Sequence, residues 1–128
     1  MKLIIVVLFL FPLYSYSQEE VAAIFYTNYD TPPEFPGGND AFSHFITDNF
    51  KYPEQALKDS IQGKIWIQFM INTDGKVSNI NIVKGLSEQL NKEAIRVFKL
   101  MPKWKAGEMK GKKVNVNFNS IPITVKLM

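Results

Sequence analysis

The feature that most constrains the fold of this chain is a change in the spacing of its apolar residues after Gln62. Before Gln62 they recur every three or four positions, and after it they alternate with polar or mixed residues. Alternation predicts a strand with one buried face. Its core-facing residues are expected to be Ile65, Ile67, Phe69 and Ile71. A turn at residues 72–76 and a returning strand at residues 77–83 complete a predicted hairpin.

Two short helices are predicted before the hairpin. The first has its cap at Asn39 or Asp40 and ends at Asn49, because Asn and Asp side chains accept hydrogen bonds from first-turn N–H groups. Pro53 has the backbone angle of a first helical residue, which predicts a second helix over residues 54–59. The inward residues of this second helix are expected to be Ala56 and Leu57.

A longer helix is predicted after the hairpin. Ser87 is its expected cap, residues 88–101 form it, and Pro102 ends it. Its apolar residues fall on one stripe, and Glu88 and Lys92 are expected to pair on the solvent side. The following stretch, up to residue 112, is predicted as turns.

The last predicted strand, residues 113–127, is the most informative segment. Its apolar residues change from even-numbered to odd-numbered positions part-way along, which predicts a bulge near Asn119 or Ser120. Pro122 lacks a backbone N–H and fits an edge strand rather than a central one. An edge strand exposes N–H and C=O groups that can accept another chain as an added strand.

Three asparagines alternate with the apolar residues of this last strand: Asn115, Asn117 and Asn119. Two interpretations of this row stay open. It is either a solvated face of the strand or a set of side chains that hydrogen-bond to a partner strand.

The first 17 residues have the composition of a secretory signal peptide. A basic residue precedes an apolar run, and the small residues Ser15 and Ser17 predict cleavage before Gln18. The alternative is a membrane anchor through residues 3–16, but a bilayer span needs about 20 apolar residues, and this run is shorter and contains Pro12. The expected organisation is a signal peptide at 1–17, an extended lead-in at 18–38 and one folded domain at 39–128, in a periplasmic or secreted protein.

Charge is segregated along the chain, whose formal net charge is +3. Residues 18–83 carry four lysines against nine acidic residues, whereas residues 84–128 carry ten basic residues against three acidic ones. Five lysines surround Trp104, namely Lys103, Lys105, Lys110, Lys112 and Lys113. A basic patch with an aromatic ring can bind nucleic acid, but export argues against that partner. The favoured alternative is a charged loop that attracts an acidic protein segment or an anionic surface, with Trp104 in the core.

The residue content argues against an enzyme. The chain has no cysteine, which excludes disulfides, a thiolate nucleophile and cysteine-bound zinc. His44 is the only histidine and is predicted on a helix surface, and no nucleophile, base and orienting group converge. No cofactor, metal or small-molecule substrate is expected.

The order and spacing of several short motifs resemble the C-terminal domain of TonB, the energy transducer of the cell envelope. The resemblance covers residues 35–127. Its motifs are Phe35-Pro36-Gly37-Gly38, Lys51-Tyr52-Pro53 with Ala56, Gly63 before the alternating strand, Asp74-Gly75 with Val77, Ala94 with Val97, Met101-Pro102-Lys103-Trp104 with Gly107, Gly111-Lys112 with Val114 and Val116, and Pro122-Ile123 with Leu127. Asn91 and Ala106 depart from the family pattern, in which Asp and Pro are common, and residues 18–36 are too short for the proline-rich spacer of TonB.

The resemblance implies an α+β fold of two layers, with helices packed on a three-stranded antiparallel sheet. It also implies a module of energy-coupled outer-membrane transport, whose last strand pairs with the TonB-box segment near the N-terminus of a transporter. The partner-binding residues are then expected to be Lys113, Val114, Asn115, Val116, Asn117, Phe118, Asn119, Tyr52 and Pro53. The alternative hypothesis is a strand-swapped homodimer or envelope scaffold, in which the same strand pairs with its twin.

Overall fold

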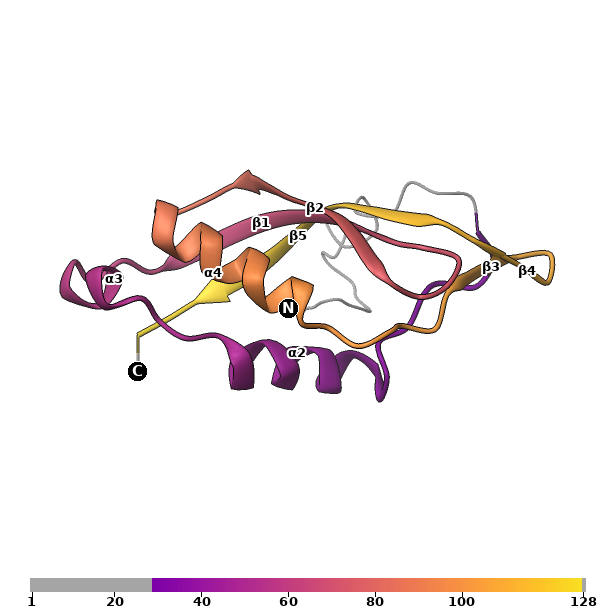
Figure 1. Ribbon diagram of the computed structural model, residues 1–128, viewed down its shortest axis with the longest axis horizontal. Helices are drawn as coiled ribbons and strands as arrows, with labels where there is room; N and C mark the ends of the chain where they lie inside the picture. The colour runs from indigo at the N-terminus through magenta and orange to yellow at the C-terminus, as the bar shows by residue number, and fades with distance from the viewer. Residues whose placement is uncertain (1–28, 128) are drawn as a thin grey trace, which may run out of the picture.

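The computed structural model describes residues 29–127, and the predicted signal peptide lies outside this part of the chain. In chain order the elements are α2 (Gly38–Asn49), α3 (Glu54–Lys58), β1 (Gly63–Ile71), β2 (Val77–Lys84), α4 (Glu88–Lys99), β3 (Gly107–Met109), β4 (Lys112–Val114) and β5 (Val116–Val125) (Figure 1). Three strands form an antiparallel sheet in the order β2-β1-β5, and β3 and β4 form a separate small sheet. The predicted α+β class, with helices on a three-stranded antiparallel sheet, is confirmed.

The alternation of β1, the central strand, decides which face of the sheet is buried. Its odd-numbered residues Ile65, Ile67, Phe69 and Ile71 are at most 1% exposed. The residues between them, such as Trp66 and Met70, are half-buried and do not belong to the core cluster. The core face predicted for this strand is therefore confirmed.

β5 contains one more residue than the stretch of β1 that it pairs with. Ile67 lies opposite Ile121, and Phe69 lies opposite Phe118. Two steps along β1 thus match three steps along β5, which confirms the bulge predicted near Asn119 or Ser120. The bulge allows Phe118 and Ile121 to be buried on the same face, at 5% and 7% exposure.

The prediction of one strand over residues 113–127 is wrong. The segment is divided at Asn115 into β4, which pairs with β3, and β5, which pairs with β1. The side-chain Oδ1 of Asn115 accepts a hydrogen bond from the backbone N–H of Thr73 at 2.9 Å. This bond ties the junction to the turn between β1 and β2.

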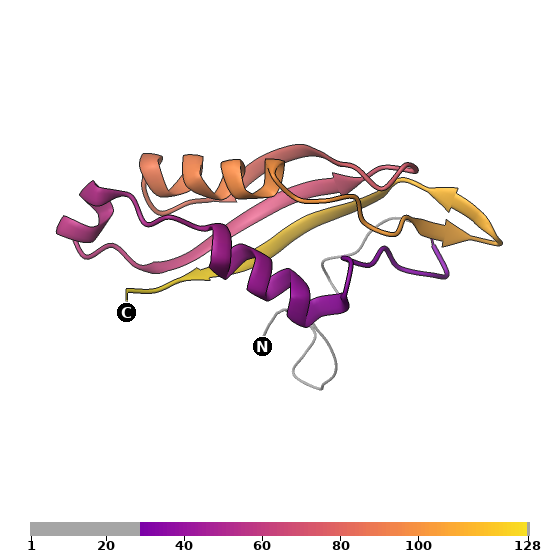
Figure 2. The same cartoon turned by 60° about the horizontal axis from the view of Figure 1, so that its bottom comes forward.

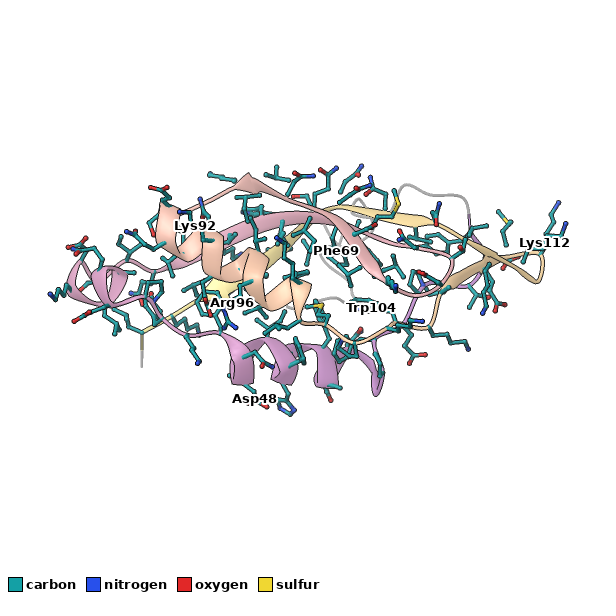
Figure 3. All side chains as sticks on the ribbon, viewed as in Figure 1. Asp48, Phe69, Lys92, Arg96, Trp104 and Lys112 are labelled. Carbon is teal, nitrogen blue, oxygen red and sulfur yellow. The ribbon has the colours of Figure 1, made fainter. Side chains whose placement is uncertain are left out.

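The stretch predicted as turns after Pro102 also contains a strand. β3 and β4 are joined by Lys110 and Gly111, both of which have positive φ angles, 51° and 81°. Two consecutive residues of this kind make the tight turn that suits a hairpin. The hairpin extends from one end of the molecule, with Lys112 near its tip (Figure 3).

α4 follows its sequence signals closely. Ser87 Oγ accepts a hydrogen bond from the Leu90 N–H at 3.2 Å, which confirms the predicted cap. Glu88 and Lys92 approach to 3.5 Å on the solvent side, as predicted. The helix ends at Lys99, two residues before the predicted end at Met101.

α2 begins earlier than predicted. Gly37 occupies the cap position with a φ of 89°, so Asn39 and Asp40 lie inside the first turn rather than at the cap. A Cβ at residue 37 would approach Ala41 Cβ to 2.9 Å, so glycine suits this tight start of the helix. The acidic side chain of Asp40 then lies where the helix dipole favours negative charge.

α3 places one of its two predicted inward residues at the surface. Ala56 is 1% exposed, but Leu57 is 49% exposed, so its predicted burial is wrong. The helix has only five residues, and one turn and a half cannot turn two consecutive side chains to the same side.

Aromatic rings from distant segments form the centre of the core. The ring centroid of Phe69 lies 5.0 Å from that of Phe98 on α4 and 4.9 Å from that of Phe118 on β5. Phe69 and Trp104 both lie in the space between sheet and helices (Figure 3). Trp104 is 9% exposed, so the interpretation of Trp104 as a core residue is confirmed.

The described part of the predicted lead-in packs against this core. Phe35 is 5% exposed, and its ring lies 5.5 Å from that of Trp104. The backbone N–H groups of Glu34 and Lys105 donate to each other's carbonyl oxygens at 3.0 and 2.8 Å. The lead-in is extended here, as predicted, and it contributes a core residue that the sequence interpretation did not identify.

Candidate functional site

β5 is an edge strand, as predicted. β1 pairs with one side of it, and no other strand within residues 29–127 pairs with its second side. The first half of β5 holds four of the predicted binding residues, Val116, Asn117, Phe118 and Asn119. Val116 and Phe118 face the core at 0% and 5% exposure, so their side chains are not accessible to a partner.

Two further predicted residues lie on the neighbouring hairpin instead. Lys113 and Val114 belong to β4, where they lie opposite Glu108 and Gly107 of β3. Asn115 lies at the junction between β4 and β5 and holds Thr73. The predicted set is therefore spread over two sheets rather than one strand.

Tyr52 and Pro53 lie beside the other half of β5. Tyr52 adjoins residues 123–127 in a common groove, and Pro53 forms the cap of α3. Val116 and Ile123 are seven residues apart, which is about 23 Å along a strand. The structure therefore does not bring Tyr52 together with residues 113–119.

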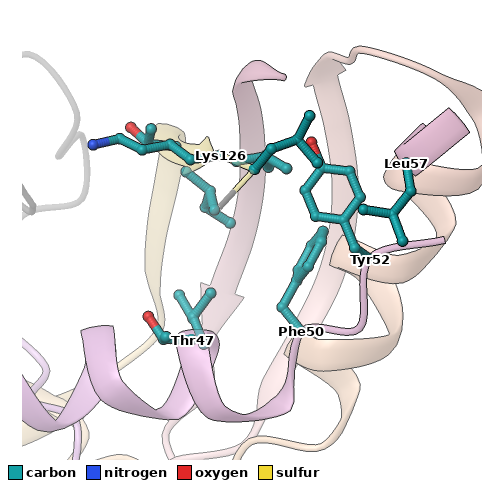
Figure 4. A pocket seen from close by; sticks show the side chains of 10 residues that line it. Thr47, Phe50, Tyr52, Leu57 and Lys126 are labelled. Atoms are coloured by element: carbon teal, nitrogen blue, oxygen red, sulfur yellow. The ribbon is translucent and has the colours of Figure 1, made fainter. Parts of the chain in front are cut away.

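The groove next to Tyr52 has a volume of about 440 Å³ and lies between the end of α2, α3 and the end of β5 (Figure 4). We call it the β5 groove, and its lining residues are Ile46, Thr47, Phe50, Tyr52, Leu57, Ile123, Thr124, Val125, Lys126 and Leu127. Five of these are consecutive. Because successive side chains of a strand point to opposite faces, a groove lined by consecutive residues runs along the strand's edge.

Most residues of the β5 groove were absent from the predicted binding set. Two sequence features could have pointed to it. Phe50 lies four residues after Ile46 and so continues an apolar side of α2 past its last residue, and Leu57, which was predicted to be buried, lies on a helix too short to bury two neighbouring residues. Leu57 joins the other apolar side chains of the groove in one contiguous patch, and such patches mark interaction sites more often than a single exposed residue does.

One hydrogen bond and one ring contact fix the wall of the groove that Phe50 and Tyr52 form. The Tyr52 hydroxyl donates to the backbone carbonyl of Ile61. The rings of Phe50 and Tyr52 meet edge to face with centroids 6.4 Å apart. These contacts hold both rings in place before any partner arrives.

Glu93 and Arg96 of α4, which we call the charged clamp, hold the backbone that leads into this wall. Glu93 accepts a hydrogen bond from the Lys51 N–H at 2.6 Å and two from Arg96 at 2.6 and 2.8 Å. Arg96 in turn donates to the Asn49 carbonyl at 2.7 Å. The bond from Arg96 is the main reason that the pKa of Glu93 lies below its ordinary value.

The asparagine row is engaged within the chain. Asn117 Nδ2 donates to Asn119 Oδ1 at 2.5 Å, and Gln68 Nε2 reaches the same oxygen at 3.5 Å. With the bond from Thr73 to Asn115, each of the three asparagines has a partner inside the protein. These bonds explain the row structurally without a binding partner.

The five lysines near Trp104 are exposed, and they extend from the loop after α4 to the hairpin of β3 and β4. Within residues 29–127, no three His, Asp or Glu side chains gather so as to hold a metal ion. In the same part of the chain no helix has the length and apolar character needed to cross a membrane. His44 lies exposed on α2.

The segment that contains this edge strand and most of the groove matches a known protein family. The family model described as the Gram-negative bacterial TonB protein C-terminal matches residues 48–127, well over half of the chain. The chain belongs to the TonB C-terminal family. No curated protein matches it in sequence.

Two solved structures similar to this TonB C-terminal domain are NMR solution structures of the Helicobacter pylori TonB C-terminal domain. One spans residues 179–285 of that protein, is 29% identical, and has a TM-score of 0.47, with 66% of this chain and 76% of that chain covered. The other spans residues 194–285, is 27% identical, and has a TM-score of 0.49, with 68% and 90% covered.

TonB C-terminal domains are non-enzymatic interaction modules of the cell envelope that are associated with transport. Their interactions are with outer-membrane transporters in general. Membership of this family makes the chain a TonB-like, transport-associated module.

Proposed function

We propose that this TonB-like protein acts in the periplasm as a non-enzymatic module that binds a peptide strand along the outer edge of β5. The peptide is a TonB-box-like segment near the N-terminus of an outer-membrane transporter. The observation that carries the proposal is that the edge of β5 and the β5 groove lie along the same line. A peptide there gains backbone pairing and apolar contact together.

β2 is the other edge of the sheet and is a poorer acceptor. Its pairing with β1 is irregular at two places, and Asn79 within it has a φ of 50°. Bulges of this kind bend an edge and interrupt the row of hydrogen-bonding groups that an added strand needs. β5 has one bulge and then keeps a regular register with β1 from Ile121 to Val125, where Pro122 is the one residue that offers no N–H.

Backbone pairing alone supports moderate affinity. Each hydrogen bond contributes about 0.5–1.5 kcal/mol net, and the cost of ordering the peptide is subtracted from their sum. The exposed lysines around Trp104 add a positive field that speeds the encounter with an acidic segment. Binding should therefore weaken as salt concentration rises.

The proposal is tested by titrating a synthetic N-terminal peptide of an outer-membrane transporter into the labelled protein while amide chemical shifts are followed. Residues 116–127 are expected to shift, and the amides of β2 serve as the internal control. Shifts absent from residues 113–127 would overturn the proposal. Sedimentation of the protein alone tests the alternative hypothesis of a strand-swapped homodimer. A dimer at every concentration would favour that hypothesis.

A further inference from the structure

The apolar stripe of α2 is only half covered. α2 has no buried residue, although Phe42, Phe45, Ile46 and Phe50 all lie against the core as half-buried side chains. α4 has the same length and buries Leu90, Ala94, Val97 and Phe98. The two helices differ in position, since α4 contacts β2 while α2 lies on the β5 side of the sheet (Figure 2).

A strand added to β5 would extend the sheet towards the uncovered side of α2. Neighbouring strands lie about 4.8 Å apart, and every second side chain of a strand points to the same face. Alternate side chains of the added strand would therefore turn towards α2. There they would meet Ile46 and Phe50, which line the β5 groove from the helix side.

The chemistry of the β5 groove selects an apolar occupant. Lys126 is the only charged residue among those that line it. Leu57 also lines the groove and is 49% exposed. Tyr52 is held by its bond to Ile61, so the wall needs no rearrangement when a side chain enters. A carboxylate or an amide that entered between Leu57 and Ile123 would lose water without gaining a partner from these two side chains.

Resting on the proposed function, we infer that the added strand carries apolar side chains at alternate positions and that a bulky one fills the β5 groove against Tyr52, Leu57 and Ile123. Backbone pairing along β5 accepts almost any sequence. The β5 groove is then the part of the protein that distinguishes one strand from another. The partner is thereby assigned a chemical class, an extended peptide with one large apolar anchor.

The test selects a displayed library of random nonapeptides on the purified chain and on two variants. Leu57→Gln removes apolar surface from the β5 groove and keeps a helix-compatible side chain of similar length. Leu100→Gln is the matched control, because Leu100 is 51% exposed against 49% for Leu57 and does not line the groove. Amide shifts of β5 report whether each selected peptide binds at the edge.

The inference expects selected peptides with apolar residues at alternate positions and a large one at a single position. Leu57→Gln should weaken their binding about tenfold, which matches the loss of one buried Leu contact, and Leu100→Gln should leave it unchanged. Peptides that shift β5 but show no alternation and bind both variants equally would overturn the inference and leave the proposed function standing. A selection that yields no peptide able to shift β5 would overturn both.

Discussion

Gly75 and Trp104 join the turn between β1 and β2 to the segment after α4. The Trp104 N–H donates to the Gly75 carbonyl at 2.8 Å, and Gly75 has a φ of 87°. A Cβ at residue 75 would stand 2.2 Å from the Trp104 carbonyl oxygen. The position therefore needs glycine twice, once for its backbone angle and once for the close approach of another backbone.

Gly75→Ala should lower the free energy of unfolding by at least about 3 kcal/mol, because the backbone of Trp104 must move as well as the turn. Gly111→Ala is the matched control. Gly111 has a similar φ of 81°, but a Cβ there would meet nothing within 4 Å, so the expected loss is only about 1–2 kcal/mol. Urea unfolding of both variants measures the difference. Equal losses in the free energy of unfolding would show that the close approach of Gly75 to Trp104 does not add to the effect of the substitution.

The connection between α2 and α3 depends on one side chain of α4. Glu93 is only 12% exposed and holds both Arg96 and the Lys51 N–H, next to the Tyr52 wall of the β5 groove. Its pKa is lower in the folded protein than in the unfolded chain. Its contribution to stability is therefore present above about pH 4.5, the ordinary value of a Glu, and is lost as the pH falls through the folded value.

Glu93→Gln should flatten the decline of stability between about pH 5 and pH 3, since an amide has no proton to take up in this range. The measurement is urea unfolding at a series of pH values. Glu88→Gln provides the comparison, because the Glu88 side chain is 79% exposed and its ion pair with Lys92 is solvated. The wild-type slope should persist in Glu88→Gln, and its persistence in Glu93→Gln would contradict the role of the clamp.

The elements predicted correctly are those whose signals are local. β1 shows an uninterrupted alternation, and α4 has a cap residue directly before its apolar stripe. The break at Asn115 depends on a bond to Thr73, 42 residues away, which no local pattern contains. The early start of α2 depends on the backbone angle of Gly37, whereas Asn39 and Asp40 only look like better caps.

The candidate site was predicted only in part, because some of its features have local sequence signals and others depend on distant segments. The edge character of the last strand follows from Pro122, and its bulge follows from the change of phase, both visible in the sequence. The β5 groove arises where the end of α2 meets the end of β5, elements more than 70 residues apart in the chain. Only the packing of the whole domain shows that Leu57 and Ile123 line the same surface.

At the scale of the whole molecule, the proposed function requires that the domain reach the periplasm. Mass spectrometry of the protein from the envelope fraction should find a mature N-terminus at Gln18, because small residues precede it after an apolar run. Replacing both small residues before the cleavage site, Ser15→Arg with Ser17→Arg, should leave the precursor uncut. A mature chain that retains Met1 would favour the anchor over the signal peptide.

Pro122 lies within β5 opposite Trp66 and has no backbone N–H to offer. Fibrils grow when identical strands stack and every copy meets a complete row of donors and acceptors. A stack of this strand would repeat the same missing donor at each layer, and proline at an edge is one of the means by which proteins discourage such stacking. The missing donor of Pro122 thus protects the edge of β5, which we propose as the peptide-binding edge, against stacking with copies of itself.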